Sequence, residues 1–237
     1  MGKKMYRVED KFECSMQDFL LLEKRIEKVL KRDVNQRNGS GYTVTSLYFD
    51  DLNDSNYRDT IEGSSIRKKY RIRIYNHSFD TIKLEVKEKK YSRILKRACP
   101  ITKEEMELLI AGKCIFDTHK TLENPITLFN TAIQTKGLRP KVIVEYDRDA
   151  YIFKPGNVRI TFDKEIRASR QIEAWGKKEI YFDPLREANH ILEVKYDEYM
   201  PEFILQMLEN GNMRQTSYSK YRLCRERKEY EFSKRCY

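Results

Sequence analysis

The residues most suited to chemistry in this chain lie in the segment 69–74, where lysine and arginine alternate with apolar residues (Lys-Tyr-Arg-Ile-Arg-Ile). In a β-strand this spacing places Lys69, Arg71 and Arg73 on one face and the apolar side chains on the other. Ammonium and guanidinium groups bind phosphate through charge-assisted hydrogen bonds. The polar face of an antiparallel sheet often does no more than meet water. The same alternation recurs in at least four other segments, however, and this recurrence favours a function.

The alternating segments together predict a mixed face that is mainly cationic. Its cations are Arg7, Lys11, Lys69, Arg71, Arg73, Lys83, Lys87, Lys89, Arg159 and Lys195, and its carboxylates are Glu9, Glu13, Glu85, Asp163 and Glu193. Arg148 shares its face with Val142, Val144 and Tyr146, so the pattern leaves the direction of Arg148 open unless the strand contains a bulge.

Two architectures accommodate such a face, and the alternation alone does not distinguish them. In an open sheet the charges meet water, whereas in a closed barrel they line the inside and helices cover the apolar outside. Cations crowded inside a barrel repel one another, and desolvating each ion costs several kcal/mol. A bound linear chain of phosphates would compensate these cations. The carboxylates among them would then hold Mg²⁺ or Mn²⁺, which bridges phosphate oxygens.

The elements that must position these residues follow from hydrophobic periodicity and helix-capping signals. Strands are predicted over residues 6–13, 42–50, 67–75, 81–90, 141–151, 158–166 and 191–197. Helices are predicted from Ser15 to about Lys31, from Thr102 to about Ala111, from Pro125 to about Thr135, and from Pro201 to Gly211. A strongly basic helix is expected from about Ser217 to Phe232. Residues 50–59 are expected to form a loop with at most a short helical turn.

Composition limits the partners and the setting. The 237 residues contain no linker-like segment, which predicts a single domain over residues 1–237. The formal net charge of +10 indicates an anionic partner, which could be nucleic acid, an anionic membrane surface or a phosphate-rich molecule. Five scattered cysteines without a C-x-x-C pair argue against a disulfide framework and a zinc site. With neither a signal peptide nor a membrane span in the sequence, a cytoplasmic protein is expected.

Eight segments, taken in order, resemble the VTC domain, the catalytic domain of the vacuolar transporter chaperone family and a polyphosphate polymerase branch of the triphosphate tunnel metalloenzymes. They are Arg7–Phe12, Ser46–Asp50, Lys69–Arg73, Leu84–Lys87, Glu145–Arg148, Val158–Asp163, Leu192–Lys195 and Ser219–Tyr221. The resemblance covers residues 6 to about 221. It implies an α+β fold in which helices pack outside an antiparallel β-barrel tunnel, as in the closed-barrel architecture.

The resemblance also implies roles for individual residues. The phosphate-binding cations are expected to be Lys11, Arg71, Arg73, Lys87, Arg148, Arg159 and Lys220, with further binding contributions from Arg7, Lys69, Lys89, Lys195 and Ser219. Glu193 is expected to hold the metal ion, Mn²⁺ or Mg²⁺, and Glu9 and Glu85 either assist it or balance neighbouring lysines. In this family the terminal phosphoryl group of ATP passes to a growing polyphosphate chain that threads the tunnel. Ser217 stands where a further lysine is expected.

Three functions therefore stay open: a polyphosphate polymerase, a hydrolase that cleaves inorganic or nucleoside triphosphates in the same tunnel, and a non-catalytic polyanion binder. The charged strands mix acids with bases and lack a set of stacking aromatic residues, so no nucleic-acid partner is expected. No P-loop motif occurs, so ATP would be held by side chains. His77, His119 and His190 lie outside the strand motifs and are not expected to act directly. No protein partner is indicated.

Overall fold

The computed structural model describes residues 8–34, 36, 41–91, 93–116, 121–177, 179–184, 190–197, 199–209, 214–216 and 219–225. The chain divides into two compact units. The first unit comprises Met1–Thr43, Tyr146–Arg167 and Pro184–Tyr218, and the second comprises Val44–Glu145, Ala168–Asp183 and Ser219–Tyr237. The single domain expected from the sequence stays a prediction.

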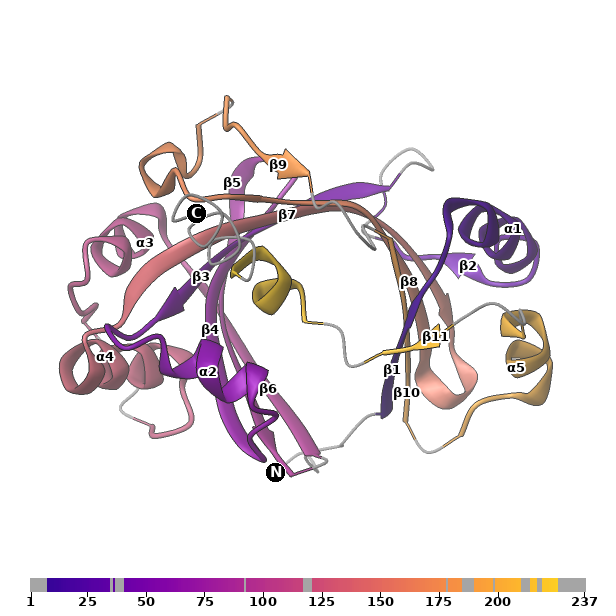
Figure 1. Cartoon of the computed structure of the whole chain (residues 1–237), viewed down its shortest axis with the longest axis horizontal. Coiled ribbons are helices and arrows are strands. Elements are labelled where there is room, and N and C mark those ends of the chain that lie inside the picture. Colours follow the sequence, from indigo (N-terminus) through magenta and orange to yellow (C-terminus); the bar gives the residue numbers. More distant parts are fainter. Residues whose placement is uncertain are drawn as a thin grey trace, which may run out of the picture. The chain divides into compact units, whose positions relative to one another are not determined.

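The first unit is built on antiparallel strands that come from distant parts of the chain (Figure 1). Across the sheet they are β11 (Arg214–Gln215), β1 (Val8–Glu13), β10 (Ile191–Tyr196), β8 (Val158–Ser169) and β7 (Arg139–Phe153). The short strands β2 (Lys31–Arg32) and β9 (Asp183–Pro184) pair with β7 and β8. The four long strands predicted here are confirmed within the described residues, whereas β2, β9 and β11 were not expected.

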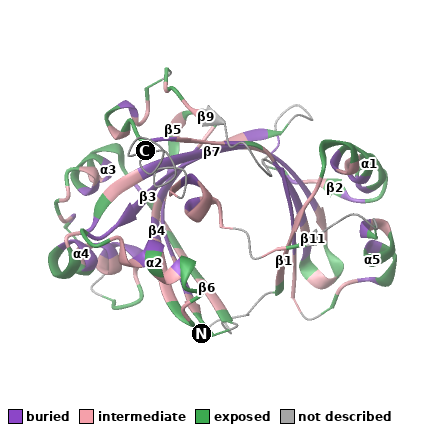
Figure 2. Cartoon of the chain, in the orientation of Figure 1, coloured by how far each residue is buried: buried purple, intermediate pink, exposed green. Residues whose placement is uncertain are grey.

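Two helices cover the apolar side of these strands, α1 (Met16–Ile26) and α5 (Glu202–Leu208). The side chains of Phe19, Leu22 and Ile26, one helical turn apart, are fully buried with strand residues of the same unit. Figure 2 shows β8 and β10 as largely buried and the outer side of α1 as exposed, whereas β1 has no buried residue. The predicted end of this helix near Lys31 is wrong. The helix ends at Ile26, because Leu30 turns back into the core and Lys31 begins β2.

Apart from β7, the strands of the second unit follow one another along the chain. In order across the sheet they are β7, β3 (Tyr42–Asp50), β4 (Ile66–Tyr75), β5 (Ser78–Lys90) and β6 (Arg93–Ile101). The β4–β5 hairpin turns at Asn76 and His77, whose φ angles of 51° and 54° suit a two-residue hairpin turn. β6 was not predicted. It is an edge strand whose residues are mostly partly or fully exposed, and it contains Pro100, which only an edge strand accepts readily.

Helices α2 (Ser55–Ile61), α3 (Lys103–Ile110) and α4 (Pro125–Lys136) belong to this unit. The predicted capping box is confirmed, since the Thr102 hydroxyl accepts from the Glu105 N–H and the Glu105 carboxylate accepts from the Thr102 N–H. Residues 51–54 form a loop as expected, but the short helical turn allowed within 50–59 is the seven-residue helix α2, which extends to Ile61. Its N-terminus is capped from five residues upstream, because the Asp50 carboxylate accepts from the Asn56 and Tyr57 N–H groups.

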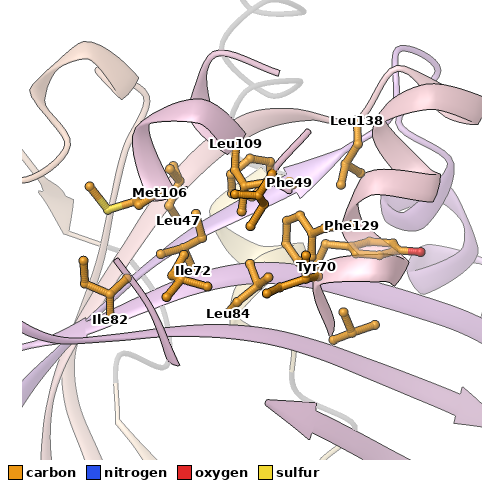
Figure 3. Close-up of a cluster of buried hydrophobic side chains, with 14 of the residues drawn as sticks. Leu47, Phe49, Tyr70, Ile72, Ile82, Leu84, Met106, Leu109, Phe129 and Leu138 are labelled. Atoms are coloured by element: carbon orange, nitrogen blue, oxygen red, sulfur yellow. The ribbon is translucent and has the colours of Figure 1, made fainter. Parts of the chain in front are cut away.

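The core of the second unit lies between its strands and α3 and α4 (Figure 3). Leu47 and Phe49 of β3, Ile72 of β4 and Leu84 of β5 are essentially inaccessible to solvent and meet Met106, Leu109 and Phe129 of the helices. Since side chains alternate along a strand, the residues between these apolar ones point to the other face of the sheet. That other face carries the charges predicted from the sequence.

Candidate functional site

In the second unit, three cations gather around one buried carboxylate. We call Arg71, Arg73, Glu85 and Lys96 the arginine cluster. Strand register sets Arg71 opposite Glu85, and Nε and Nη2 of Arg71 both lie 2.6 Å from Glu85 Oε2. Arg73 Nη1 lies 3.8 Å from the same oxygen, and Lys96 Nζ lies 2.6 Å from Glu85 Oε1. The cluster is therefore a cationic arrangement held in place by a single anion.

The charges in this cluster shift one another's pKa. Burial by itself raises the pKa of Glu85, but the positive charges of Arg71, Arg73 and Lys96 outweigh it and hold that pKa well below its usual range. Loss of hydration around the ammonium lowers the pKa of Lys96 to about 7; Glu85 opposes this shift, whereas Arg71 and Arg73 add to it. Glu85 is thus always ionised near neutral pH, whereas Lys96 changes charge there.

Neighbouring side chains of β3 hold the two arginines in place. Arg71 Nη1 donates to the Tyr48 hydroxyl at 2.8 Å, and Arg73 Nε donates to the Ser46 hydroxyl at 3.2 Å. Both partners belong to the segment Ser46–Asp50 that carries the family resemblance. Oriented guanidinium groups need little reorganisation to bind a phosphate.

A C-terminal segment, residues 219–225, packs onto the same unit, and residues 220–225 are helical. Lys69 Nζ donates to the Ser219 hydroxyl at 2.8 Å. The Tyr221 hydroxyl donates to Asp50 Oδ2 at 2.6 Å, and its ring stacks on Tyr48 with centroids 5.1 Å apart. These contacts keep Ser219 and the partly buried Lys220 on the unit that holds the arginine cluster.

In the first unit, two lysines and two carboxylates alternate on neighbouring strands, which we call the lysine–glutamate cluster. Register sets Lys11 opposite Glu193 and Glu9 opposite Lys195. Lys11 Nζ lies 3.1 Å from Glu9 Oε1 and 3.7 Å from Glu193 Oε1. Lys195 Nζ lies 2.9 Å from Glu193 Oε2 and 4.0 Å from Glu9 Oε2. Each carboxylate therefore contacts both lysines.

Arg148 points to this cluster, which answers the question that the sequence pattern left open. Its Nη2 lies 3.7 Å from Glu193 Oε2, and its Nε and Nη2 donate to the two carboxylate oxygens of Asp163. Although burial disfavours a charged guanidinium, Asp163 and Glu193 raise the pKa of Arg148 well above its ordinary value. Arg148 is therefore a buried, permanently charged group.

The remaining predicted residues are placed as follows. Arg159 lies on β8, opposite Lys195 on β10, and its Nη2 contacts Asp33 Oδ2 at 2.7 Å and the Tyr42 hydroxyl at 3.2 Å. Lys87 and Lys89 lie on β5, on the same face as Glu85. Arg7 and Ser217, together with most of the predicted basic C-terminal helix, lie outside the described residues.

Sequence reasoning missed Lys96, because β6 was not recognised as a strand. Continuing the hairpin pairing from β5 would have found it, since Lys96 lies opposite Lys87. Asp163 was counted among the charged residues without a role, because its contact with Arg148 depends on that arginine's direction. Tyr221 carried no signal beyond its place in the last resembling segment.

A divalent cation fits the lysine–glutamate cluster better than the arginine cluster. No group of three or more His, Cys, Asp or Glu side chains that could hold a metal occurs among the described residues. Mg²⁺ commonly takes only one or two carboxylates and completes its shell with phosphate oxygens and water. Glu193 and Glu9 could supply those two carboxylates. The arginine cluster, by contrast, offers only the single carboxylate of Glu85.

The sheet with helices on one face and this charged network on the other has the α+β triphosphate tunnel fold predicted from the sequence. The model of the VTC domain matches residues 6–227, and the chain belongs to the VTC domain family. No curated protein matches the sequence. Within the described residues, no helix combines the length and the apolar character needed to cross a membrane.

Solved structures resemble this chain at low sequence identity. A protein of Vibrio parahaemolyticus described as a candidate adenylate cyclase has 14% identity and a TM-score of 0.50, covering 91% of this chain and 97% of its own. A similarly described Bacillus halodurans protein has 14% identity and a TM-score of 0.49, covering 87% of each chain. The triphosphatase of the Mimivirus capping enzyme has 14% identity and a TM-score of 0.39, covering 86% of each chain. At this identity the Vibrio structure supports the fold alone.

Proposed function

We propose that this protein is a metal-dependent polyphosphate polymerase, which transfers the terminal phosphoryl group of ATP to a growing polyphosphate chain. The family match and the fold support a triphosphate tunnel enzyme as the general class. The observation that carries the proposal is the arginine cluster, in which Arg71, Arg73 and Lys96 surround one carboxylate.

Phosphoryl transfer depends mainly on positioning and on neutralising charge that develops on the phosphate oxygens. Arg71 and Arg73 are oriented for this role by Glu85 and by the hydroxyls of β3. The accepting end of a polyphosphate chain is already an anionic oxygen, so no side-chain base is needed. This accords with the placement of His77, whose Nδ1 lies 3.6 Å from Glu145 and which is no part of either cluster.

The lysine–glutamate cluster supports the metal part of the proposal. Glu193, assisted by Glu9, would hold Mn²⁺ or Mg²⁺, which supplies neutralisation of phosphate charge when bound. Lys11 and Lys195 contact both carboxylates and Arg148 contacts Glu193, so these ion pairs hold the carboxylates in place before a ligand arrives. We assign the metal to these carboxylates rather than to Glu85.

The decisive experiment is phosphorus NMR of the purified protein with ATP and Mn²⁺, alongside a gel stained for polyphosphate. The polymerase produces internal-phosphate signals together with a matching amount of ADP. Orthophosphate or pyrophosphate without polymer would instead establish the hydrolase, and no turnover would contradict an enzymatic role under these conditions.

A paired variant tests the residues. Arg71→Ala/Arg73→Ala is expected to abolish triphosphate binding while leaving the circular dichroism spectrum unchanged. Lys24→Ala/Lys28→Ala, which removes two exposed cations in and just after α1, is the charge-matched control and should bind as the native protein does. Retained binding by the arginine variant would refute the assignment of the arginine cluster.

A further inference from the structure

The cationic face of the second unit continues beyond the arginine cluster, along β4 and β5. Register pairs Arg71 with Glu85, then Lys69 with Lys87, and then Arg67 with Lys89. The last pair lies four residues from the first along each strand, which is about 13 Å at the usual rise of a strand. The outermost pair is therefore a separate position on the same face.

Two cations face each other directly at this outer position. Like charges opposite one another on neighbouring strands destabilise a sheet. Among the described residues no carboxylate lies within ion-pair distance of Arg67 or Lys89. Arg67 Nη1 instead donates to the Ser64 carbonyl at 3.3 Å. Loss of hydration lowers the pKa of Lys89, and the charge of Arg67 adds to that effect.

The opposite face of the same strands provides an internal comparison. There Lys68 lies on β4 and Lys90 on β5, and both contact the buried carboxylate of Glu88, at 3.9 Å and 3.4 Å. Arg97 reaches the same carboxylate at 3.0 Å. At this end of β4 and β5, a carboxylate therefore balances the cations on the face away from the arginine cluster. Among the described residues, none does so for Arg67 and Lys89 on the other face.

We propose that Arg67 and Lys89 form an outer anion subsite for a linear phosphate chain that extends from the arginine cluster along β4 and β5. The proposal rests on the proposed function and deepens it. A ligand that contacts both the arginine cluster and this pair must span about 13 Å. A chain of several phosphates does so, and a single phosphate does not. The outer subsite therefore favours long chains over short ones.

The test compares Arg67→Gln/Lys89→Gln with Lys68→Gln/Lys90→Gln, which removes the same number of charges from the same strands on the other face. Binding of triphosphate and of a polyphosphate several times longer is measured by calorimetry. The Arg67/Lys89 variant should bind the long chain at least about tenfold more weakly, as expected for two lost charge-assisted contacts, and triphosphate within about twofold of native. The Lys68/Lys90 variant should change neither affinity by more than about twofold.

A second readout needs no ligand. Because Arg67 and Lys89 repel each other, the Arg67/Lys89 variant should unfold at the same or a higher temperature than the native protein, whereas the Lys68/Lys90 variant should unfold at a lower one. Equal losses for triphosphate and the long chain, or no loss for either, would overturn the outer subsite alone. Failure of the native protein to bind either ligand would instead overturn the proposed function, and the subsite with it.

Discussion

The guanidinium of Arg148 donates to both carboxylate oxygens of Asp163, with Nε to Oδ1 at 2.6 Å and Nη2 to Oδ2 at 2.8 Å. Both residues are buried, and β7 and β8, joined by the turn at Pro155–Asn157, bring them together. A bidentate ion pair of this kind fixes the plane of the guanidinium. It therefore determines how Arg148 faces Glu193.

Asp163→Asn should lower the free energy of unfolding by about 3 to 5 kcal/mol, because it leaves the Arg148 charge buried without its main partner. Urea denaturation measures the change. Asp147→Asn is the control, since the Asp147 pair with Arg167 is longer, at 3.6 Å, and partly exposed. That variant should cost less than about 1 kcal/mol. Similar losses for the two variants would contradict the importance assigned to Asp163.

Tyr221→Phe should weaken triphosphate binding several-fold and lower the free energy of unfolding by about 1 to 3 kcal/mol. The variant keeps the ring on Tyr48 but removes the hydrogen bond to the side chain of Asp50, which is worth about that much. Calorimetry and urea denaturation supply the two values. Tyr181→Phe, at an exposed position, should change neither. Unaltered binding by Tyr221→Phe would show that the Tyr221–Asp50 hydrogen bond is not needed to position Ser219 and Lys220 for binding.

Triphosphate affinity should fall as pH rises from about 6 to 9, and Lys96 should account for part of the fall. Its pKa is lowered to about 7, so the side chain is cationic below that pH and neutral above it. An anion binds the cationic form more tightly. Lys96→Arg stays charged throughout and should show a shallower pH dependence. Titration of the ligand itself is common to both proteins, so identical profiles would argue against a role for Lys96.

The lowered pKa of Lys96 also makes the free energy of unfolding depend on pH in a defined direction. In the ligand-free protein Lys96 binds fewer protons when folded than when unfolded between about pH 7 and its ordinary value of 10.5. Its contribution to the free energy of unfolding therefore rises with pH across that window. Thermal unfolding of the native protein and of Lys96→Met at several pH values is the measurement. The stability of the native protein relative to the variant should fall as the pH is lowered toward 7.

Glu193→Gln should weaken Mn²⁺ binding by at least about tenfold while triphosphate binding without metal is retained. The carboxylate is one of two that the lysine–glutamate cluster offers to a cation, and its amide replacement has no charge. Electron paramagnetic resonance of free Mn²⁺ gives the affinity independently of turnover. Glu13→Gln on β1 is the matched control. Equal Mn²⁺ affinity in the Glu193 variant and the native protein would place the metal elsewhere.

Much of the fold was predictable because alternation in strands and one-turn spacing in helices depend on burial, which leaves a clear pattern. Arg71 and Glu85 were placed on the charged faces of their strands for this reason. The helix α2 was not predictable, since its cap is the distant Asp50 rather than a residue at its own start. The cap that the helix would ordinarily use, Asp54, has a left-handed backbone and makes no side-chain capping bond.

The direction of Arg148 depended on a partner in another strand, which no local pattern reveals. Lys96 was hidden for a different reason, because an edge strand that is largely exposed has little apolar alternation. The roles of the predicted site residues stay predictions, but their proximity within each cluster follows from strand register, which turn residues such as Asn76 and His77 help to fix.

The strand order also sets a sequence of events during synthesis. In the second unit, β4, β5 and β6 are consecutive, so their pairing is local and can form as soon as residue 101 has left the ribosome. In the first unit, β1 pairs with β10 and β11, so residues 8–13 must wait for partners made more than 175 residues later. Residues 8–13 are thus synthesised well before they are paired, and Glu9 and Lys11 meet Glu193 and Lys195 only after the intervening strands have been made.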